Sequence, residues 1–201
     1  MAQDTIEFSR FSGTKEEAIE LLELPETDLD TIYILLKSFP KDTDVESNVA
    51  MALSLRTSVY DREKGKHVKM DEMLSILAES QDMQARWAVA KNPHTMETIL
   101  AKLAKDPINL VRALVANNPK TPASMLTELF NDEKIVRDGL TGNPNTPEKL
   151  LKLFINENDR MARLRVADNP GATKAILEAL VNDEDKDVRT AAQKKLEALK
   201  G

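Results

Sequence analysis

The chain has 201 residues, of which 41% are hydrophobic and 31% charged, with a net charge of −6 and no cysteine. This composition excludes disulfides, thiolate metal sites and cysteine-ligated iron–sulfur clusters, and no apolar run reaches the roughly 18 residues of a membrane span. The acidity lies in residues 1–44, with 4 basic and 11 acidic side chains. The remainder is nearly neutral and lacks the positive field of phosphate-binding proteins. Because the N-terminus has no basic signal-peptide start, we expect a cytoplasmic protein.

The first segments of the chain predict two short helices behind an irregular leader. Residues 1–13 show no sustained period, so we expect no regular structure there. Thr14 followed by Glu17 predicts an N-cap with a capping box, and Pro25 ends this first helix. A second helix is expected from Thr27 or Asp28 to just before Pro40.

Residues 45–81 continue the helical pattern with one interruption. A third helix is expected over 45–55, and a fourth over 71–79. Between them, residues 57–70 are highly charged and have no counterpart later in the chain, which predicts a surface insertion. Residues 14–81 are therefore expected to form degenerate helical repeats that cap the N-terminal end of a single continuous domain, 14–201.

From residue 82 to the C-terminus the sequence repeats itself. A valine or alanine followed by arginine recurs, and an Asn-Pro pair follows six residues after each arginine except the last. The arginines are 26, 25, 26 and 26 residues apart, namely Arg86, Arg112, Arg137, Arg163 and Arg189. The asparagines follow the same period, namely Asn92, Asn118, Asn143 and Asn169. A fixed period of this length predicts an all-α repeat solenoid with about five regular repeats of 25–26 residues.

Each repeat is expected to contain a short helix and a longer one. The short helix begins at the arginine pair and ends at Asn-Pro, because proline forbids its continuation. Thr121-Pro122 and Thr146-Pro147 predict a threonine N-cap with proline at the first helical position of the longer helix. The longer helices carry apolar residues at matching positions, which predicts columns of like side chains in the core: Ile99/Met125/Leu150/Ile176, Leu100/Leu126/Leu151/Leu177 and Leu103/Leu129/Phe154/Leu180.

The pattern Val-Arg-x-x-Val-Ala-x-Asn-Pro-x-Thr-Pro, followed by Leu-Leu-x-x-Leu, resembles the leucine-rich repeat variant family over residues 82–193. The Asp132 to Val136-Arg137 spacing also resembles HEAT and armadillo-like repeats. The resemblance implies a right-handed superhelix in which short helices, often of 3₁₀ character, alternate with α-helices. Some family members carry a cysteine-rich iron–sulfur module, which this chain lacks. The family's functions are mostly undetermined, so the resemblance implies a fold more than an activity.

Two interpretations apply to the periodic polar columns. The arginines would suit a ladder for phosphates, but carboxylates recur with the same period, which favours ion pairs that join adjacent turns. The expected partners are Asp82, Asp106, Asp132, Asp159 and Asp185. The asparagines are expected to satisfy backbone groups at the turn before each proline.

Departures from the period indicate binding more directly. Trp87 stands where other repeats have Ala113, Asp138, Leu164 and Thr190. It is either an exposed binding anchor or a side chain that covers the junction with the irregular N-terminal half. We predict a partner-binding surface on the short helices, formed by Trp87, Lys91, Asn117, Asp138, Arg165 and Asp168.

No catalytic or cofactor motif is present. His67 and His94 are the only histidines and have no partner at metal-ligand spacing, and no nucleophile elbow, Walker loop or dinucleotide fingerprint occurs. We therefore expect no enzyme, metal or cofactor, but a module that binds a protein or peptide. The alternative is a DNA-binding HEAT-like protein related to glycosylases of alkylated bases, with Arg163 and Arg165 on phosphates. The near-neutral repeats make nucleic acid the weaker hypothesis.

Overall fold

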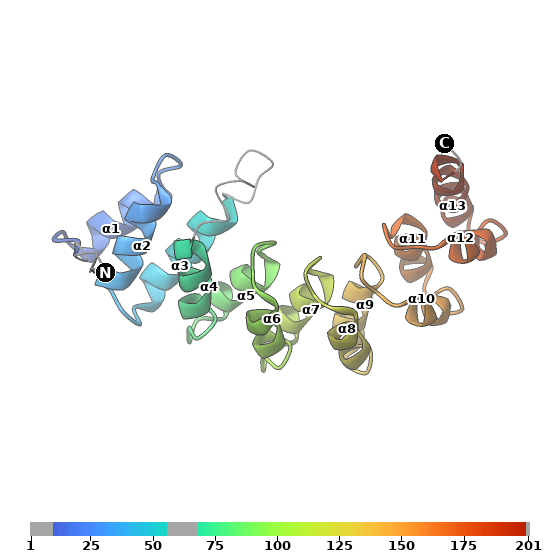
Figure 1. The fold of residues 1–201 in the computed structure, drawn as a ribbon, viewed down its shortest axis with the longest axis horizontal. Helices are drawn as coiled ribbons and strands as arrows, with labels where there is room; N and C mark the ends of the chain where they lie inside the picture. Colours follow the sequence, from blue (N-terminus) through green and yellow to red (C-terminus); the bar gives the residue numbers. More distant parts are fainter. Residues whose placement is uncertain (1–9, 56–67, 200–201) are drawn as a thin grey trace, which may run out of the picture. The chain divides into compact units, whose positions relative to one another are not determined.

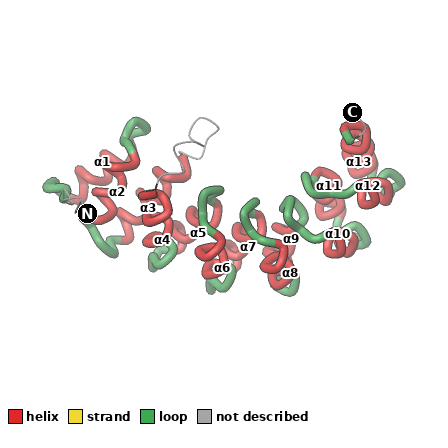
Figure 2. The backbone as a smooth tube through the Cα atoms, in the orientation of Figure 1, coloured by secondary structure: helices red, strands yellow, loops and turns green. Residues whose placement is uncertain are grey.

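The computed structural model describes residues 10–55 and 68–199, and within these ranges the chain is entirely helical, as the sequence predicts (Figures 1 and 2). The helices are joined by short turns. They are α1 (Lys15–Glu23), α2 (Leu29–Ser38), α3 (Thr43–Leu55), α4 (Val68–Leu77), α5 (Met83–Lys91), α6 (Glu97–Leu103), α7 (Asn109–Asn117), α8 (Ala123–Leu129), α9 (Lys134–Leu140), α10 (Glu148–Phe154), α11 (Arg160–Asp168), α12 (Lys174–Leu180) and α13 (Lys186–Ala198).

Internal contacts divide the chain into two compact units, residues 1–99 and residues 100–201. The division falls inside α6. Residues 1–9 of the predicted leader and 57–67 of the predicted insertion, with His67, lie outside the described residues. None of the helices in the described part is long and apolar enough to cross a membrane.

In unit 1 (residues 1–99) the helices form two rows. The odd-numbered helices pack in sequence, α1 on α3 and α3 on α5, while α2 packs on α4. Each row contributes an apolar face, including Val45 and Val49 from α3 and Leu74 and Leu77 from α4, all fully buried. The predicted capping box starts α1: Thr14 Oγ1 accepts from the Glu17 amide at 3.2 Å, and the Glu17 carboxylate accepts from the Thr14 amide at 2.8 Å.

Unit 2 (residues 100–201) repeats this arrangement. Here α7 packs on α9, α11 packs on α13, and α10 packs on α12. The even-numbered helices were expected to be the longer ones, but α8, α10 and α12 have seven residues each, whereas the odd-numbered helices of this unit have seven to thirteen. The even-numbered helices bury the predicted apolar columns, with Leu126, Leu151, Phe154 and Leu177 completely inaccessible. Helices of seven to nine residues are too short to persist alone in water, so packing between rows supplies most of their stability.

The short helices differ from the family expectation, because those in the described part are α-helical, without a separate 3₁₀ segment. Bonds of the tighter i→i−3 type occur at their C-terminal ends, where Asn118 N donates to Val115 O at 3.1 Å and Asn169 N donates to Val166 O at 3.1 Å. Such tightening of a last turn is common and satisfies an otherwise orphaned carbonyl.

The threonines of the Thr-Pro pairs are not N-caps, which corrects the sequence prediction. Pro122 and Pro147 themselves occupy the cap positions of α8 and α10, without a side-chain cap. Thr121 and Thr146 are buried, and each hydroxyl donates to the carbonyl six residues earlier, for example Thr146 to Leu140 O at 2.7 Å. Their role is thus to close the end of the preceding short helix, whose carbonyls would otherwise be buried without donors.

Candidate interaction surface

The arginine column joins successive turns in unit 2. Arg112 on α7 binds the Asp132 carboxylate with two parallel bonds, from Nε at 2.7 Å and from Nη2 at 2.8 Å. Its Nη1 donates to the backbone carbonyl of Asp106 at 2.8 Å. The hydrogen bonds from Arg112 hold the pKa of Asp132 below its ordinary value, although partial burial opposes them. The Arg112 guanidinium therefore connects the turn before α7, at Asp106, to the turn between α8 and α9, at Asp132.

Arg163 repeats this geometry and is almost fully buried. Its Nε and Nη2 donate to Asp183 at 2.8 and 3.2 Å, Nη2 also reaches Glu184 at 2.9 Å, and Nη1 donates to Glu157 O at 2.9 Å. Burial raises the pKa of Asp183, but the bond and charge of Arg163 together with the bond from the Asp185 amide outweigh it, so that the pKa lies below its ordinary value. Arg137 pairs with Glu157 and lies over the rings of Phe130 and Phe154, 5.1 and 5.7 Å from their centroids.

Some predicted partners of the arginines are wrong. Asp132 pairs with Arg112, but Asp159 and Asp185 are N-caps: their carboxylates accept from backbone amides at the starts of α11 and α13. Asp82 likewise caps α5. The carboxylates that meet Arg137 and Arg163 stand two residues earlier, at Glu157 and Asp183.

The remaining arginines of the column bind backbone. Arg86 Nη1 donates to the carbonyls of Ser80 and Gln81 at 2.9 and 3.1 Å, and Arg189 Nη1 donates to those of Asp183 and Glu184 at 2.6 and 2.9 Å. Both thus fasten the turn that precedes their own helix.

The asparagine column binds backbone at the turns, and its side chains also reach between repeats. Asn92, Asn118, Asn143 and Asn169 are buried, and each Oδ1 accepts the amide two residues later, at 2.7 to 2.9 Å. Asn143 Nδ2 also donates to Ala116 O at 2.7 Å and to Asn118 O at 2.8 Å. Asn169 does the same one repeat later, with Thr141 O at 2.8 Å and Asn143 O at 2.9 Å.

Lys195 continues this ladder, which sequence reasoning missed. It lies 26 residues after Asn169, and its Nζ donates to Asn169 O, as Asn169 donates to Asn143 O. Burial lowers the pKa of Lys195, and the nearby Asp168 carboxylate partly opposes this. The fifth repeat thus lacks Asn-Pro but keeps a donor at the same position. Counting the period past Asn169 would have found it.

The predicted partner-binding residues lie on the odd-numbered helices. In unit 1, Trp87 is half-buried on α5, and the exposed Lys91 places its Nζ 5.0 Å from the Trp87 ring centroid. In unit 2, Asn117, Arg165 and Asp168 are exposed, and Asp138 is half-buried. Asp138 also pairs with Lys134 at 2.8 Å. These groups are on three different helices of unit 2, so they are spread along the row and do not form one cluster.

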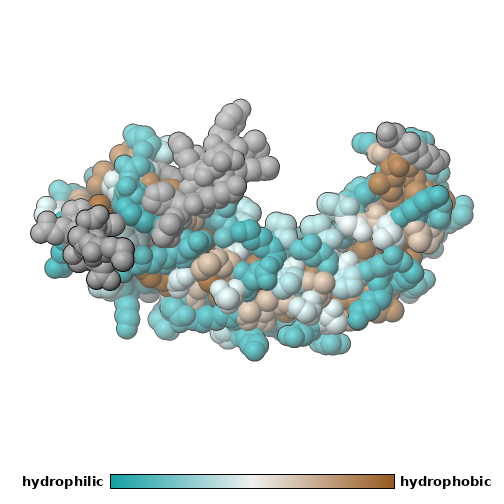
Figure 3. Space-filling model, in the orientation of Figure 1, coloured by the Kyte–Doolittle hydropathy of each residue, from teal (hydrophilic) through white to brown (hydrophobic). Residues whose placement is uncertain are grey.

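A row of exposed apolar side chains lies on the same helices and was not predicted. Leu110 on α7, Ile135 on α9 and Met161 on α11 are 44%, 42% and 47% exposed. Each stands two residues before the arginine of its repeat, so the three occupy the same position in three successive repeats. We call these three residues the apolar strip. Figure 3 shows that the visible surface is mostly hydrophilic, with hydrophobic areas limited in extent. The signal was present in the sequence as Leu, Ile and Met at a spacing of 25–26.

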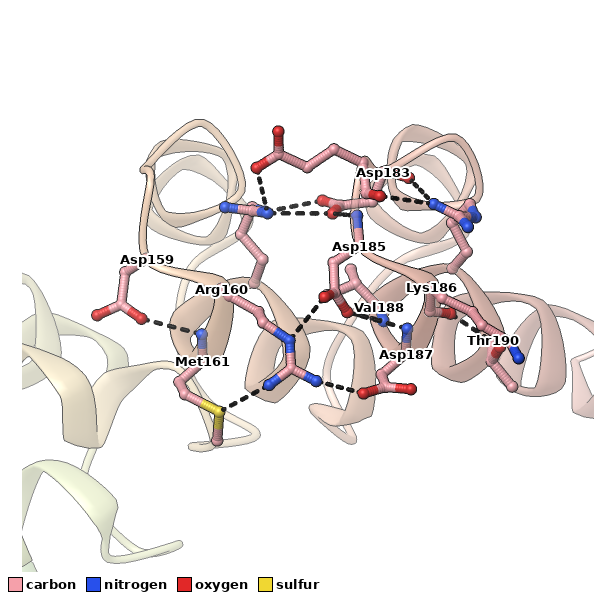
Figure 4. Close-up of polar contacts among 12 residues, drawn as sticks. Asp159, Arg160, Met161, Asp183, Asp185, Lys186, Asp187, Val188 and Thr190 are labelled. Atoms are coloured by element: carbon pink, nitrogen blue, oxygen red, sulfur yellow. Dashed lines mark hydrogen bonds and ion pairs between the residues drawn. The ribbon is translucent and has the colours of Figure 1, made fainter.

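A line of polar contacts borders the apolar strip at the starts of the same helices. Lys134 binds Asp159 at 2.6 Å, and Arg160 binds Asp185 at 2.7 Å and also Asp187. Figure 4 shows Arg160 reaching from α11 to these two carboxylates at the start of α13, with Met161 beside it. Asn109 completes the line through Glu133 at 2.9 Å. The strip therefore has an ordered polar edge.

The described residues contain no group of three or more His, Cys, Asp or Glu side chains that would hold a metal ion. A comparison of the chain with models of known protein families, and with characterised proteins, found no match. The fold class and the surface just described are therefore the basis for assigning a function.

Proposed function

We propose that the chain is a helical repeat solenoid of the leucine-rich repeat variant type that binds another protein through the odd-numbered helices of unit 2. Three observations support the solenoid: the 25–26-residue period, the packing of odd helices on odd helices within each unit, and side chains that bond to the neighbouring repeat. Each repeat leaves an apolar face that only another repeat covers, which is the basis of such architectures.

The apolar strip is the single observation that carries the binding function. An isolated exposed leucine is ordinary on a protein surface, but here the same repeat position is apolar and exposed in three successive repeats. The polar edge formed by Lys134 and Arg160 gives this surface the anatomy of a protein interface, with an apolar centre and a charged rim.

The partner that fits this surface is an amphipathic helical segment of another protein. Helices that pack directly on each other lie about 8–10 Å apart. Because α7 packs on α9, Leu110 and Ile135 offer two apolar contacts at about that spacing. A helix presents apolar side chains at i, i+3, i+4 and i+7, which is about 5–10 Å of rise. Aspartates and lysines along the rim would then select the charged flank of the partner.

The DNA-binding alternative receives less support. The guanidinium of Arg163, which that reading assigns to phosphate, already binds Asp183 and Glu184 and is 5% exposed. Arg165 is exposed, but a single cation does not provide the clustered charge that phosphate binding requires.

The proposed surface is tested by replacing Ile135 with aspartate. A charge at the centre of the apolar strip should weaken capture of a specific partner at least tenfold, because a central apolar anchor contributes about 1–2 kcal/mol or more. Leu153→Asp is the matched control, since Leu153 is 49% exposed but lies on α10, in the even-numbered row. The measurement is quantitative affinity capture with mass spectrometry, using all three proteins.

A partner that is retained by wild type and Leu153→Asp but lost by Ile135→Asp supports the proposal. If every captured protein responds equally to both variants, the strip is not the binding surface. Circular dichroism of both variants should match wild type, since both side chains are already half in solvent.

A further inference from the structure

Unit 1 contains one repeat in which the arginine column is broken. The segment Val45-Glu46-Ser47-Asn48-Val49-Ala50 has the pattern of Val111-Arg112-Ala113-Leu114-Val115-Ala116, with glutamate in place of arginine. The structure supports this alignment: Val45 and Val111 are both fully buried near the starts of α3 and α7, helices of the odd-numbered series. Glu46 therefore stands where other repeats have a guanidinium.

The group facing Glu46 has changed as well. In unit 2 the column arginine reaches a carboxylate of the following turn, as Arg112 reaches Asp132. In unit 1 the corresponding contact goes from α3 to the turn after α4, where Ser80 Oγ donates to Glu46 Oε2 at 2.5 Å. An arginine–carboxylate pair is thus replaced by a glutamate–serine pair, and no cation from the described part of the chain pairs with Glu46.

Glu46 is consequently a buried carboxylate with few partners. It is 4% exposed, and among the described residues the Ser80 hydroxyl is its one hydrogen-bond donor. A buried carboxylate is costly to keep ionised unless a cation or several donors compensate it. The two lysines nearby do not provide this: Lys37 binds Glu72 at 3.1 Å, and Lys41 is exposed.

A pocket of about 620 Å³ opens beside this carboxylate, entirely within unit 1. Its size lies within the range of about 300–1,000 Å³ that is usual for small-ligand sites. Leu36, Pro40 and Ile76 give it apolar walls, and Glu46 and Ser80 belong to its lining. The other lining residues are Lys37, Lys41, Thr43, Glu79 and Gln81.

We propose that this pocket binds a guanidinium group supplied from outside the chain, which takes the place that Arg112 and Arg163 fill in their own repeats. The carboxylate of Glu46, on α3, would accept hydrogen bonds from this guanidinium. In unit 2 the column guanidinium also donates to the carbonyls six and five residues before it, as Arg112 does to Asp106 and Pro107. At Glu46 those positions are the carbonyls of Pro40 and Lys41, both in the pocket lining.

The chemistry favours guanidinium over a simple ammonium. A guanidinium has five N–H donors in a plane and is weakly hydrated, so it binds a carboxylate and backbone carbonyls together and enters an apolar pocket at lower cost. The apolar walls suit the aliphatic stem of an arginine.

Two sources share this chemistry, the arginine side chain of a protein segment and a free guanidino compound. The inference does not depend on the apolar strip of unit 2.

The experiment titrates the full chain with capped arginine (Nα-acetyl-arginine methylamide) by calorimetry and by methyl NMR of Ile76. Capped citrulline has the same shape without the charge, and capped lysine has the charge without the planar fork. We expect saturable binding of capped arginine with shifts at Ile76, and at least tenfold weaker binding of the other two probes. Equal binding of capped arginine and capped citrulline would overturn the proposal.

Two variants locate the site. Glu46→Gln keeps the shape and should weaken capped-arginine binding at least tenfold, whereas Glu97→Gln, at an exposed glutamate of α6, should leave it unchanged. The double change of Glu46→Arg with Ser80→Asp rebuilds the pair of the other repeats, so it should abolish binding and raise the melting temperature. Unchanged binding by this double variant would also refute the site, and its thermal stability reports directly on folding.

A comparison of free arginine with capped arginine distinguishes the two sources. Binding that is tenfold tighter for free arginine identifies a small molecule as the ligand. Binding that is as tight or tighter for capped arginine identifies a protein side chain.

Discussion

At the scale of single residues, the identity of the side chain is often decided by the neighbouring repeat. Gly139 lies within α9, where alanine is ordinarily preferred by about 1 kcal/mol. A Cβ at Gly139 would stand 2.8 Å from Ala113 O and 2.9 Å from Ala116 Cβ, both on α7. The glycine therefore allows α9 to approach α7 closely.

Gly139→Ala should consequently destabilise the chain by about 1–3 kcal/mol, because the added methyl overlaps a backbone oxygen that cannot move without shifting α7. Gly142→Ala is the matched control. Its Cβ would meet only Asn117 Oδ1 at 3.7 Å, an ordinary contact. We expect that variant to be neutral or slightly more stable, since alanine restricts the unfolded chain. Urea denaturation measures both, and equal midpoints for the two variants would contradict this account of Gly139.

Lys195 illustrates the same dependence on neighbours. Its Nζ replaces the amide of an asparagine because only the donor and its position matter to Asn169 O. The long side chain of Lys195 reaches from α13 to the Asn169 carbonyl. One repeat earlier, the equivalent carbonyl of Asn143 accepts from the side-chain amide of Asn169.

At the scale of elements, the turns are connected by arginine–carboxylate pairs, and these connections depend on pH. The pKa of Asp132 in the folded chain lies below its ordinary value of 3.8, because of the hydrogen bonds from Arg112. A depressed carboxylate pKa contributes stability that is fully present above the unfolded pKa and is lost as the pH falls through the folded pKa.

Asp132→Asn should therefore lower the free energy of unfolding by roughly 1–3 kcal/mol at pH 7, as expected for hydrogen bonds to a charged group that is mostly buried. The difference from wild type should shrink when the pH falls below about 4, since Asp132 of the unfolded chain then takes up a proton while the folded carboxylate still excludes it. Urea unfolding at pH 7, 5 and 3 measures this. Glu178→Gln serves as control, because the Lys174–Glu178 pair is exposed and contributes little. A difference independent of pH would show that the pair does not act through charge.

At the scale of the whole molecule, the proposed solenoid makes a prediction about size. A compact domain of this length has a radius of gyration of about 16–17 Å. Repeats added end to end lengthen a molecule in one direction, so the proposed solenoid should give a clearly larger radius, of roughly 20 Å or more. Small-angle X-ray scattering measures it directly. A value near that of a compact domain would contradict the solenoid, whatever the packing within each unit.

Much of the local structure could be read from the sequence, because it depends on residues close together in the chain. The capping box at Thr14 and Glu17 and the alternation of helices around Asn-Pro turns are of this kind. The buried columns through Leu126 and Leu151 followed from periodicity. The threonine before each proline was misassigned, because an N-cap and a hydroxyl that closes the preceding helix have the same local sequence.

The sequence by itself determined the helical class, the period and the positions of the core, since these follow from spacing along one chain. Only the tertiary structure decided which carboxylate meets each arginine, why Gly139 is a glycine, and that Leu110, Ile135 and Met161 remain uncovered. It also revealed that Glu46 is left beside a pocket without a guanidinium. The physical reason is that pairing, close approach and exposure depend on the distance between side chains of different repeats, which the period fixes only to within a residue or two.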